Sequence, residues 1–363
     1  MLSRLLLLGV CLFMNSLFIN TLFMNQALAS PTLTTSSQLK EWGLAGLTDR
    51  FQQQAKAGQF MTNDGLSLPY GKLVNPTHQK AIILVNGRTE TYLKYQELAL
   101  DLFNNGYNVY LYDHRGQGLA PRMLSNPDMG YVANFDDYVQ DLEQFVQQVV
   151  LNEPVEQLYL LSHSMGGAIA ALWLSQTQVR LQAAALSSPM IGIYLKPLPR
   201  WLVTGLLATL QQGCQWLGHE ACYAPGQGDY QALPFKDNVL THSETRYQLQ
   251  AEQLELTPKV RLGGATLHWL QQALSAGDQA IAQAGRITTP VLVVQAGKDR
   301  VVDNDAQVRF CQALPACAGG QPLVVKKGAH ELFFERDNQR RQALEAILAF
   351  FEQYAAPAGS SQP

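Results

Sequence analysis

Ser164 lies in a short segment that is typical of a nucleophilic serine. The apolar, strand-like run Leu158–Leu161 precedes it, and Gly166 and Gly167 follow it at the start of an Ala- and Leu-rich helical pattern. This strand–turn–helix pattern is related to G-x-S-x-G, in which a tight turn exposes the hydroxyl group. Ser162 stands where that motif has glycine, and serine is small enough for the turn. We therefore predict that Ser164 is the nucleophile of an acyl-transfer reaction.

A serine hydroxyl attacks an acyl carbon only when a base takes its proton, and the base needs a carboxylate to fix its tautomer. In open α/β sheets, such groups gather beyond the carboxyl ends of strands. Asp299 follows the strand-like run Val291–Val294, and His330 follows Leu323–Val325. The order Ser164, Asp299, His330 is that of the α/β-hydrolase fold. The sequence therefore predicts a Ser-His-Asp catalytic triad.

Other acidic residues and histidines are weaker candidates for the same roles. Asp303 lies further from the strand end than Asp299, and Asp305 falls in the following helix. Successive residues at a sharp turn point apart, which disfavours His163 as the base. The remaining histidines are expected to be structural or solvated, and they are His78, His114, His219, His242 and His268.

Backbone N–H groups are the expected stabilisers of the oxyanion that forms during acyl transfer. The first is the N–H of Met165, which directly follows the nucleophile. The second comes from the loop after the apolar run Ala81–Val85, where Gly87 lets the main chain approach, and we favour the N–H of Arg88. The alternative, that this loop is simply a turn, is compatible with the prediction because the donor belongs to the main chain.

The segments around these residues alternate between strands and helices. Apolar, strand-like runs recur at 81–85, 107–112, 158–161 and 182–187, with helical patterns between them. This alternation predicts an α/β fold with a mostly parallel central sheet, right-handed crossovers and helices on both faces. The turn Asn63-Asp-Gly65 predicts an antiparallel hairpin at the sheet edge.

The alternation stops between residues 190 and 287, where five prolines and an apolar helical pattern at Trp201–Leu210 replace it. We predict an inserted, mainly helical cap at 190–287. The insertion divides the hydrolase core into a first part at 30–189 and a second part at 288–354. The remaining segment, 355–363, is expected to be a disordered tail.

The first 29 residues have the pattern of a secretory signal peptide. Arg4 precedes the apolar run Leu5–Phe23, and Ala27-x-Ala29 forms a cleavage site. An uncleaved membrane anchor is the alternative, because the run approaches the ~20 residues that span a bilayer. We predict export to the periplasm or the medium, with membrane association through an uncleaved N-terminus as the alternative.

The cysteines agree with export. Of five cysteines, Cys11 would leave with the signal peptide. The other four form two close pairs in the sequence, which predicts two local disulfides in an exported protein: Cys214 with Cys222 and Cys311 with Cys317. None of these cysteines has a histidine at metal-ligand spacing, and no metal site is predicted.

Composition and charge limit the possible partners. Hydrophobic residues make up 47% of the 363-residue chain and charged residues only 15%, against roughly 25% in an average globular protein, so the chain can bury a sizeable core. The net charge of −3 argues against a nucleic-acid partner, which requires a basic surface. No Lys- or Arg-rich run is present to bind anionic membranes or to mark a charged headgroup.

Five motifs together resemble the bacterial lysophospholipases of the α/β-hydrolase superfamily, which are relatives of the monoacylglycerol lipases: Asn86–Glu90, Asp113–Gly118, Leu161–Gly167, Gly297–Asp299 and Gly328–His330. Segments of the predicted cap also resemble the lysophospholipases: Leu233–Phe235, Leu240–Ser243, Leu262–Gly264 and His268-Trp269. The resemblance covers about Gln59 to Tyr354.

The resemblance implies a Ser-His-Asp triad, a helical cap, no cofactor and single-chain lipids as substrates. It favours hydrolysis of the acyl ester of a lysophospholipid, with peripheral membrane association as a further possibility. Trp201 and Leu206 would then contact the acyl chain, and internal packing of the cap is an equally strong interpretation. A monoacylglycerol lipase or a general carboxylesterase is the alternative function. A non-catalytic lipid-binding protein is a further alternative, although all three triad residues are present.

Overall fold

A computed structural model describes residues 30–195 and 197–356 of the chain. The predicted signal peptide at 1–29, Cys11 within it, and residues 357–363 of the predicted tail lie outside this part. None of the described helices is long and apolar enough to cross a membrane. The predictions for the two chain ends therefore stay predictions.

In the described part of the chain, eight strands form one sheet in the order β1-β2-β4-β3-β5-β6-β7-β8. β1 and β2 are antiparallel, β2 is antiparallel to β4, and the other neighbouring pairs are parallel. The mostly parallel sheet and the edge hairpin, which turns at Gly65, are confirmed. The strands are β1 (Ala55–Met61), β2 (Ser67–Leu73), β3 (Lys80–Val85), β4 (Tyr107–Tyr112), β5 (Gln157–His163), β6 (Ala183–Ser187), β7 (Val291–Ala296) and β8 (Leu323–Val325).

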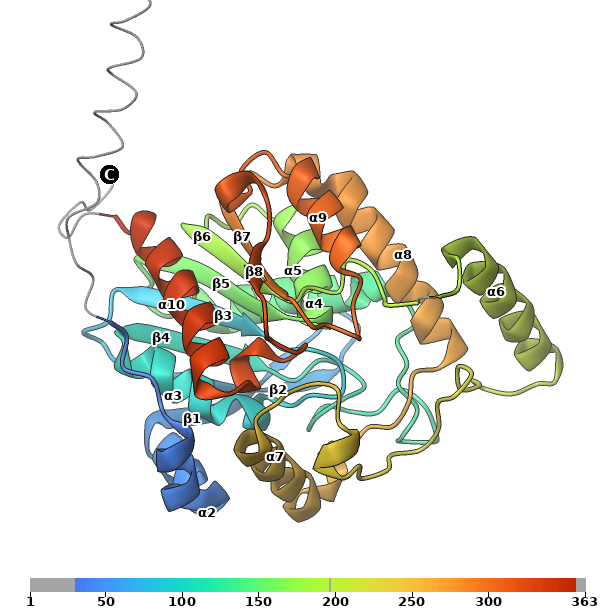
Figure 1. Cartoon of the computed structure of the whole chain (residues 1–363), viewed down its shortest axis with the longest axis horizontal. Helices are drawn as coiled ribbons and strands as arrows, with labels where there is room; N and C mark the ends of the chain where they lie inside the picture. Colours follow the sequence, from blue (N-terminus) through green and yellow to red (C-terminus); the bar gives the residue numbers. More distant parts are fainter. Residues whose placement is uncertain (1–29, 196, 357–363) are drawn as a thin grey trace, which may run out of the picture. The chain divides into compact units, whose positions relative to one another are not determined.

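Helices cover both faces of this sheet (Figure 1). Ile83 and Val85 of β3 pack with the helices of one layer, and Ile82 and Leu84 pack with those of the other. Because both faces are buried, the central strands are continuous apolar runs. The first layer holds α4 (Phe135–Phe145), α5 (Met165–Leu174), α8 (Leu267–Gln283) and α9 (Asn304–Ala313), and the second holds α2 (Ser36–Gln54), α3 (Gln96–Asn104) and α10 (Asp337–Gln353).

Helix α2 does not follow from the hydrophobic pattern of the sequence. Its buried residues Leu39, Leu44, Leu47 and Phe51 stand in a segment that is polar on average, and Gly43 interrupts the helix with a φ of +60°. A reciprocal capping box between Thr35 and Gln38 begins it. This capping pair is the sequence signal that could have located the helix.

Seven short helical segments complete the list of helices in the described residues. The 3-10 helix η1 (Tyr92–Tyr95) leads directly into α3, and the π-helical turn η2 (Val146–Val150) continues α4. α4 and η2 therefore form one continuous helical run between β4 and β5. The other short helices are η3 (Phe235–Asp237), η4 (Pro258–Val260), η5 (Ala284–Arg286), η6 (Ala318–Gly320) and η7 (Leu332–Phe334).

Residues 190–287 contain three long helices that lie at different places. α8 packs on α5 in the helical layer of the sheet. α6 (Arg200–Trp216) packs on α8 through Leu207 and Leu274, and Figure 1 shows it projecting away from the sheet. α7 (Glu244–Leu256) packs against α2. The limits of the cap at 190 and 287 stay a prediction.

Both expected disulfides are present. Cys214 in α6 is bonded to Cys222, with 6.1 Å between their Cα atoms, and Cys311 in α9 is bonded to Cys317, with 5.4 Å. The first bond ties the end of α6 to the loop that follows it. The second closes the turn between α9 and η6.

Candidate active site

Ser164 lies at the turn from β5 into α5, with a φ of +52°. Such a value is unfavourable for a residue other than glycine and marks a strained turn. A Cβ atom on Gly166 would lie 2.2 Å from the carbonyl oxygen of Val85, and one on Gly167 would lie 2.4 Å from Pro189. The two glycines therefore let α5 start directly against the neighbouring chain, which holds the serine above the sheet.

The structure brings Ser164, His330 and Asp299 together. His330 Nε2 lies 2.9 Å from Ser164 Oγ, and His330 Nδ1 lies 2.8 Å from Asp299 Oδ2. The three residues follow β5, β8 and β7, so they meet at the carboxyl edge of the parallel strands. This arrangement allows a proton to pass from the serine to the imidazole while the carboxylate holds the ring.

Asp299 is held as a carboxylate. Its other oxygen, Oδ1, accepts hydrogen bonds from the N–H groups of Val301 and Val302, at 2.8 and 3.1 Å. Burial alone would raise the pKa of Asp299, but the charge and hydrogen bond of His330 and the two N–H groups lower it below its ordinary value. The weaker candidate Asp303 instead caps α9 by accepting from Asp305 N–H.

The loop after β3 lies beside the nucleophile. A Cβ atom on Gly87 would lie 3.2 Å from the Cβ of Ser164, so Gly87 is needed for this approach. Glu90 accepts a hydrogen bond from Gly87 N–H, and the Gln117 side-chain amide donates to the Gly87 carbonyl at 2.7 Å. The loop that carries Arg88 is thus fixed on both sides next to Ser164.

The Asp113–Gly118 motif supports this loop. Asp113 is fully buried and accepts hydrogen bonds from Thr91 Oγ1 and from Tyr92 and Leu119 N–H. Burial raises the pKa of Asp113 to about 7, although these hydrogen bonds oppose the rise. The motif therefore holds the main chain around the site, and none of these contacts reaches the nucleophile.

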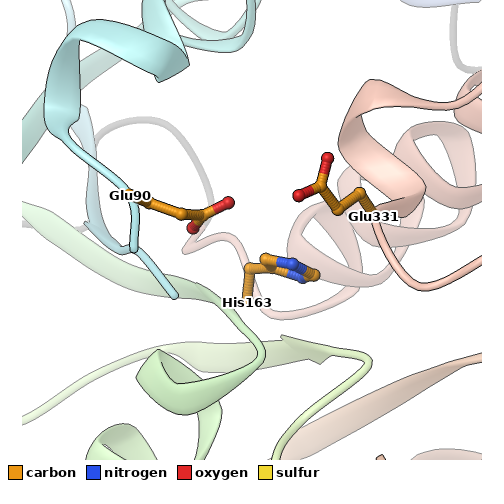
Figure 2. Close-up of side chains that lie close together, drawn as sticks. All are labelled: Glu90, His163 and Glu331. Atoms are coloured by element: carbon orange, nitrogen blue, oxygen red, sulfur yellow. The ribbon is translucent and has the colours of Figure 1, made fainter. Parts of the chain in front are cut away.

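A buried ionic cluster, formed by Glu90, Lys94, Glu331, Tyr95 and His163, lies beside the triad. In Figure 2 the carboxylates of Glu90 and Glu331 point towards each other above the imidazole of His163. Lys94 Nζ lies 2.7 Å from Glu90 and 2.6 Å from Glu331, and Tyr95 donates to Glu90. Burial raises the pKa of Glu90, but the charge and hydrogen bond of Lys94, together with the hydrogen bond of Tyr95 and the neighbouring His163, outweigh it and the pKa falls to about 2.

Three residues of this cluster could hold a metal ion, since one ligand atom from each of Glu90, His163 and Glu331 lies within 4.8 Å of the others. No other such group occurs in the described residues. The ammonium group of Lys94 contacts both carboxylates and already supplies the compensating cation. The cluster therefore acts as an ion-paired support of the site without a metal ion.

His163 is not placed to act on the serine. Burial lowers its pKa to about 3, so the ring is neutral, and it packs against the His330 ring with 4.8 Å between centroids. His114 bonds the carbonyl of Asn86, and His268 bonds that of Ala133. These histidines have structural contacts.

A cavity of about 590 Å³ opens at Ser164 and His330. Its walls are mostly apolar, and they include Ile193, Leu198, Val203, Leu206, Leu207 and Leu270. Of the two residues expected to contact substrate, Leu206 lines the cavity and Trp201 does not. Trp201 is 74% exposed, because it lies on the side of α6 opposite to Val203 and Leu207.

The sequence patterns predict neither the ionic cluster nor the hydrogen bonds of Gln117. The i, i+4 spacing of Glu90 and Lys94 was the available signal for a helix-like ion pair. Glu331 joins them from 237 residues further along the chain, and no local pattern indicates that contact.

Comparison with known proteins gives consistent relatives. The profile of the Hydrolase_4 family, described as serine aminopeptidase, S33, matches residues 76–337. Lysophospholipase L2 of Escherichia coli (strain K12) is 39% identical over 331 residues, which cover 90% of this chain and 96% of that protein. Probable lysophospholipase L2 of Haemophilus influenzae is 33% identical over 314 residues, which cover 85% of this chain and 96% of that protein.

Solved structures show the same fold. The crystal structure of a soluble variant of monoglyceride lipase from Saccharomyces cerevisiae, in complex with a substrate analogue, superposes with a TM-score of 0.64. It shares 17% sequence identity and covers 82% of this chain and 96% of its own. At this identity the likeness shows the fold alone.

Proposed function

The chain belongs to the serine aminopeptidase S33 family of α/β-hydrolases and is an ester-hydrolysing enzyme, and on this premise we propose that it is a lysophospholipase. It would cleave the single acyl ester of a lysophospholipid and release a fatty acid and a glycerophosphodiester. The 39% identity to lysophospholipase L2 supports this substrate class, and the apolar cavity beside Ser164 is suited to an acyl chain. A monoacylglycerol lipase is the second candidate, because the apolar walls of the cavity also suit the acyl chain of a monoacylglycerol.

We propose a two-step reaction for the site. Ser164 Oγ attacks the ester carbonyl while His330 takes its proton, and Asp299 stabilises the resulting imidazolium. The N–H groups of Met165 and Arg88 stabilise the oxyanion. The imidazolium then protonates the leaving alcohol, and a water molecule, deprotonated by His330, hydrolyses the acyl-enzyme. The observation that carries this mechanism is the chain of two hydrogen bonds, 2.9 and 2.8 Å long, that joins the three side chains.

We also propose that the enzyme binds membrane surfaces through α6. Trp201 and Trp216 are 74% and 87% exposed, and both lie on the side of the helix away from the cavity. Exposed tryptophans of this kind suit the interface between headgroups and acyl chains. The two disulfides are compatible with export, and we propose that the protein is exported. We also propose that residues 190–287 form a cap inserted into the hydrolase core.

One experiment tests the catalytic proposal. The enzyme and its Ser164→Ala variant are incubated with a fluorophosphonate probe, and fatty-acid release is then measured from a lysophospholipid and from a monoacylglycerol with the same acyl chain. We expect labelling and release from both substrates only in the enzyme with Ser164, and faster release from the lysophospholipid. An enzyme that labels but prefers the monoacylglycerol would be a monoacylglycerol lipase, and a protein that does not label would be a lipid-binding protein.

A further inference from the structure

Arg88 places a buried positive charge at the catalytic cavity. The residue is half-buried and lines the cavity together with Trp269. Its guanidinium carbon lies 4.9 Å from the centre of the Trp269 ring, and its Nη2 donates to the Gly263 carbonyl at 2.9 Å. A cation–π contact and one hydrogen bond therefore hold the guanidinium group in place.

The other donors of this group have no protein acceptor. Arg88 Nε is buried and has no hydrogen-bond partner among the described residues, and none is found for Nη1. A buried donor without a partner costs about 1–3 kcal/mol, and more when it carries charge. A ligand that accepts these hydrogen bonds would remove this cost.

The Arg88 charge also has no counter-ion. No carboxylate of the described residues forms an ion pair with it. The two acidic residues that line the cavity, Glu90 and Glu331, form ion pairs with Lys94 and not with Arg88. Burial lowers the pKa of Arg88 to about 10, so it still carries its charge at neutral pH. A desolvated cation of this kind creates a site for an anion.

The main chain leaves room for the guanidinium group. A Cβ atom on Gly130 would lie 2.3 Å from Arg88 Nη2. Gly130 is held in place by two main-chain hydrogen bonds, one from its N–H to the Gly264 carbonyl and one from Thr266 N–H to its own carbonyl. The position of the guanidinium is therefore built by two segments that are distant from Arg88 in the chain, one around Gly130 and one from Gly263 to Trp269.

We propose that the Arg88 side chain binds the phosphate of a lysophospholipid and makes the enzyme prefer this substrate to a monoacylglycerol. This inference rests on the lysophospholipase function proposed above. Arg88 belongs to the loop beside Ser164, and in the substrate only glycerol carbons separate the acyl ester from the phosphate. A guanidinium group with free Nε and Nη donors matches two oxygens of a phosphodiester. The site selects the phosphate and leaves the group beyond it undefined.

The test compares two substrates that share one acyl chain, 1-oleoyl-lysophosphatidylethanolamine and 1-oleoylglycerol. For Arg88→Met we expect kcat/KM for the lysophospholipid to fall about 10- to 100-fold relative to that for the monoacylglycerol, mainly through KM. Arg88→Lys should lose less of this preference for the lysophospholipid, because lysine keeps the positive charge but lacks the forked donors of arginine. Gly130→Ala keeps Arg88 in the sequence, but its added Cβ atom should displace the guanidinium group. The ratio of kcat/KM for the lysophospholipid to that for the monoacylglycerol should therefore fall here too.

The main-chain role proposed for Arg88 has a different signature. Damage to the oxyanion hole would lower kcat for both substrates equally, and an unchanged ratio in Arg88→Met and Gly130→Ala would overturn the inference. Glycerol 3-phosphate provides a second measurement, as an inhibitor of 1-oleoylglycerol hydrolysis. Its inhibition constant should rise about 10-fold or more in Gly130→Ala, and an equal constant would also overturn the inference.

The inhibitor measurement separates the two proposals. If the enzyme does not cleave the lysophospholipid, the proposed function fails, while inhibition by glycerol 3-phosphate that depends on Gly130 and Arg88 would still support the anion site. If Arg88→Met does not fold, Arg88→Lys and Gly130→Ala decide the result by the same two measurements.

Discussion

Replacing Lys94 by methionine tests whether the buried ionic cluster stabilises the fold. Lys94 Nζ lies 2.7 Å from Glu90 and 2.6 Å from Glu331, and the three side chains are only 3–5% exposed. Methionine keeps the apolar length of lysine but leaves two facing carboxylates without a cation. Removing one partner of a buried ion pair typically costs about 3–5 kcal/mol. We expect Lys94→Met to lower the free energy of unfolding by that amount at pH 8.

The pH dependence of stability should reverse in this variant. In the wild type, the pKa of Glu90 is lowered to about 2 despite burial, because Lys94 is charged. The resulting stabilisation is present above the unfolded pKa of about 4.3 and is lost as the pH falls towards 2. In Lys94→Met, burial raises the pKa of Glu90 above the unfolded value, so stability is lost as the pH rises. The variant should therefore be more stable at pH 5 than at pH 8.

The assay is urea denaturation followed by tryptophan fluorescence at pH 5 and pH 8. Arg341→Met is the matched control, because its ion pair with Glu345 is about 40% exposed and should contribute less than about 1 kcal/mol. The triple variant Glu90→Gln, Lys94→Met, Glu331→Gln removes every unpaired charge and should recover much of the loss. A Lys94→Met protein within about 1 kcal/mol of the wild type at pH 8, with the same pH trend, would refute the reasoning.

Three further predictions concern the site and its supports. Asp299→Asn should lower kcat by about 10⁴-fold at pH 7, because His330 loses the carboxylate that fixes its tautomer, and a fall of less than tenfold in steady-state assays would contradict that role. Gly166→Ala places a Cβ atom 2.2 Å from the Val85 carbonyl oxygen, so we expect a loss of about 1–3 kcal/mol of stability together with reduced activity. An unchanged Tm and rate would show that the turn has room to relax. Replacing Cys214 and Cys222 by serine should cost roughly 2–3 kcal/mol, since the bond closes a loop with a sequence separation of 8. Equal urea midpoints for the variant and the wild type would show that α6 unfolds independently of the core.

The fold and the order of the candidate triad could be predicted because they depend on local patterns. Continuous apolar runs mark strands that are buried on both faces, and the segment around Ser164 requires small residues wherever β5 turns into α5. The positions of Asp299 and His330 follow from topology, because the carboxyl ends of parallel strands meet at one edge of the sheet. A chain that forms this sheet brings these residues close together.

Contacts that join distant segments could not be predicted in this way. Trp201 is apolar and lies in an apolar helix, but its rotation relative to Val203 decides that it faces away from the cavity. Glu331 meets Lys94 across 237 residues, and Arg88 approaches Gly263 across 175. The sequence contains no basic run that would indicate a headgroup site. One buried guanidinium group can bind a phosphate without neighbours of the same charge, so the proposed site does not require such a run.

Lys94 and Arg88 illustrate how burial distinguishes a structural charge from a functional one. Both belong to the segment after β3; Arg88 lines the catalytic cavity, and Lys94 binds Glu90 and Glu331, which also line it. Lys94 is paired with two carboxylates, and its pKa is raised because their charges outweigh burial. Arg88 has no such partner, and burial lowers its pKa. Neutralising Lys94 should therefore reduce stability, whereas neutralising Arg88 should remove an unpaired buried charge and leave stability equal or higher. Urea denaturation of Arg88→Met beside Lys94→Met measures this difference, and a loss of more than about 2 kcal/mol in Arg88→Met would show that Arg88 is a structural residue.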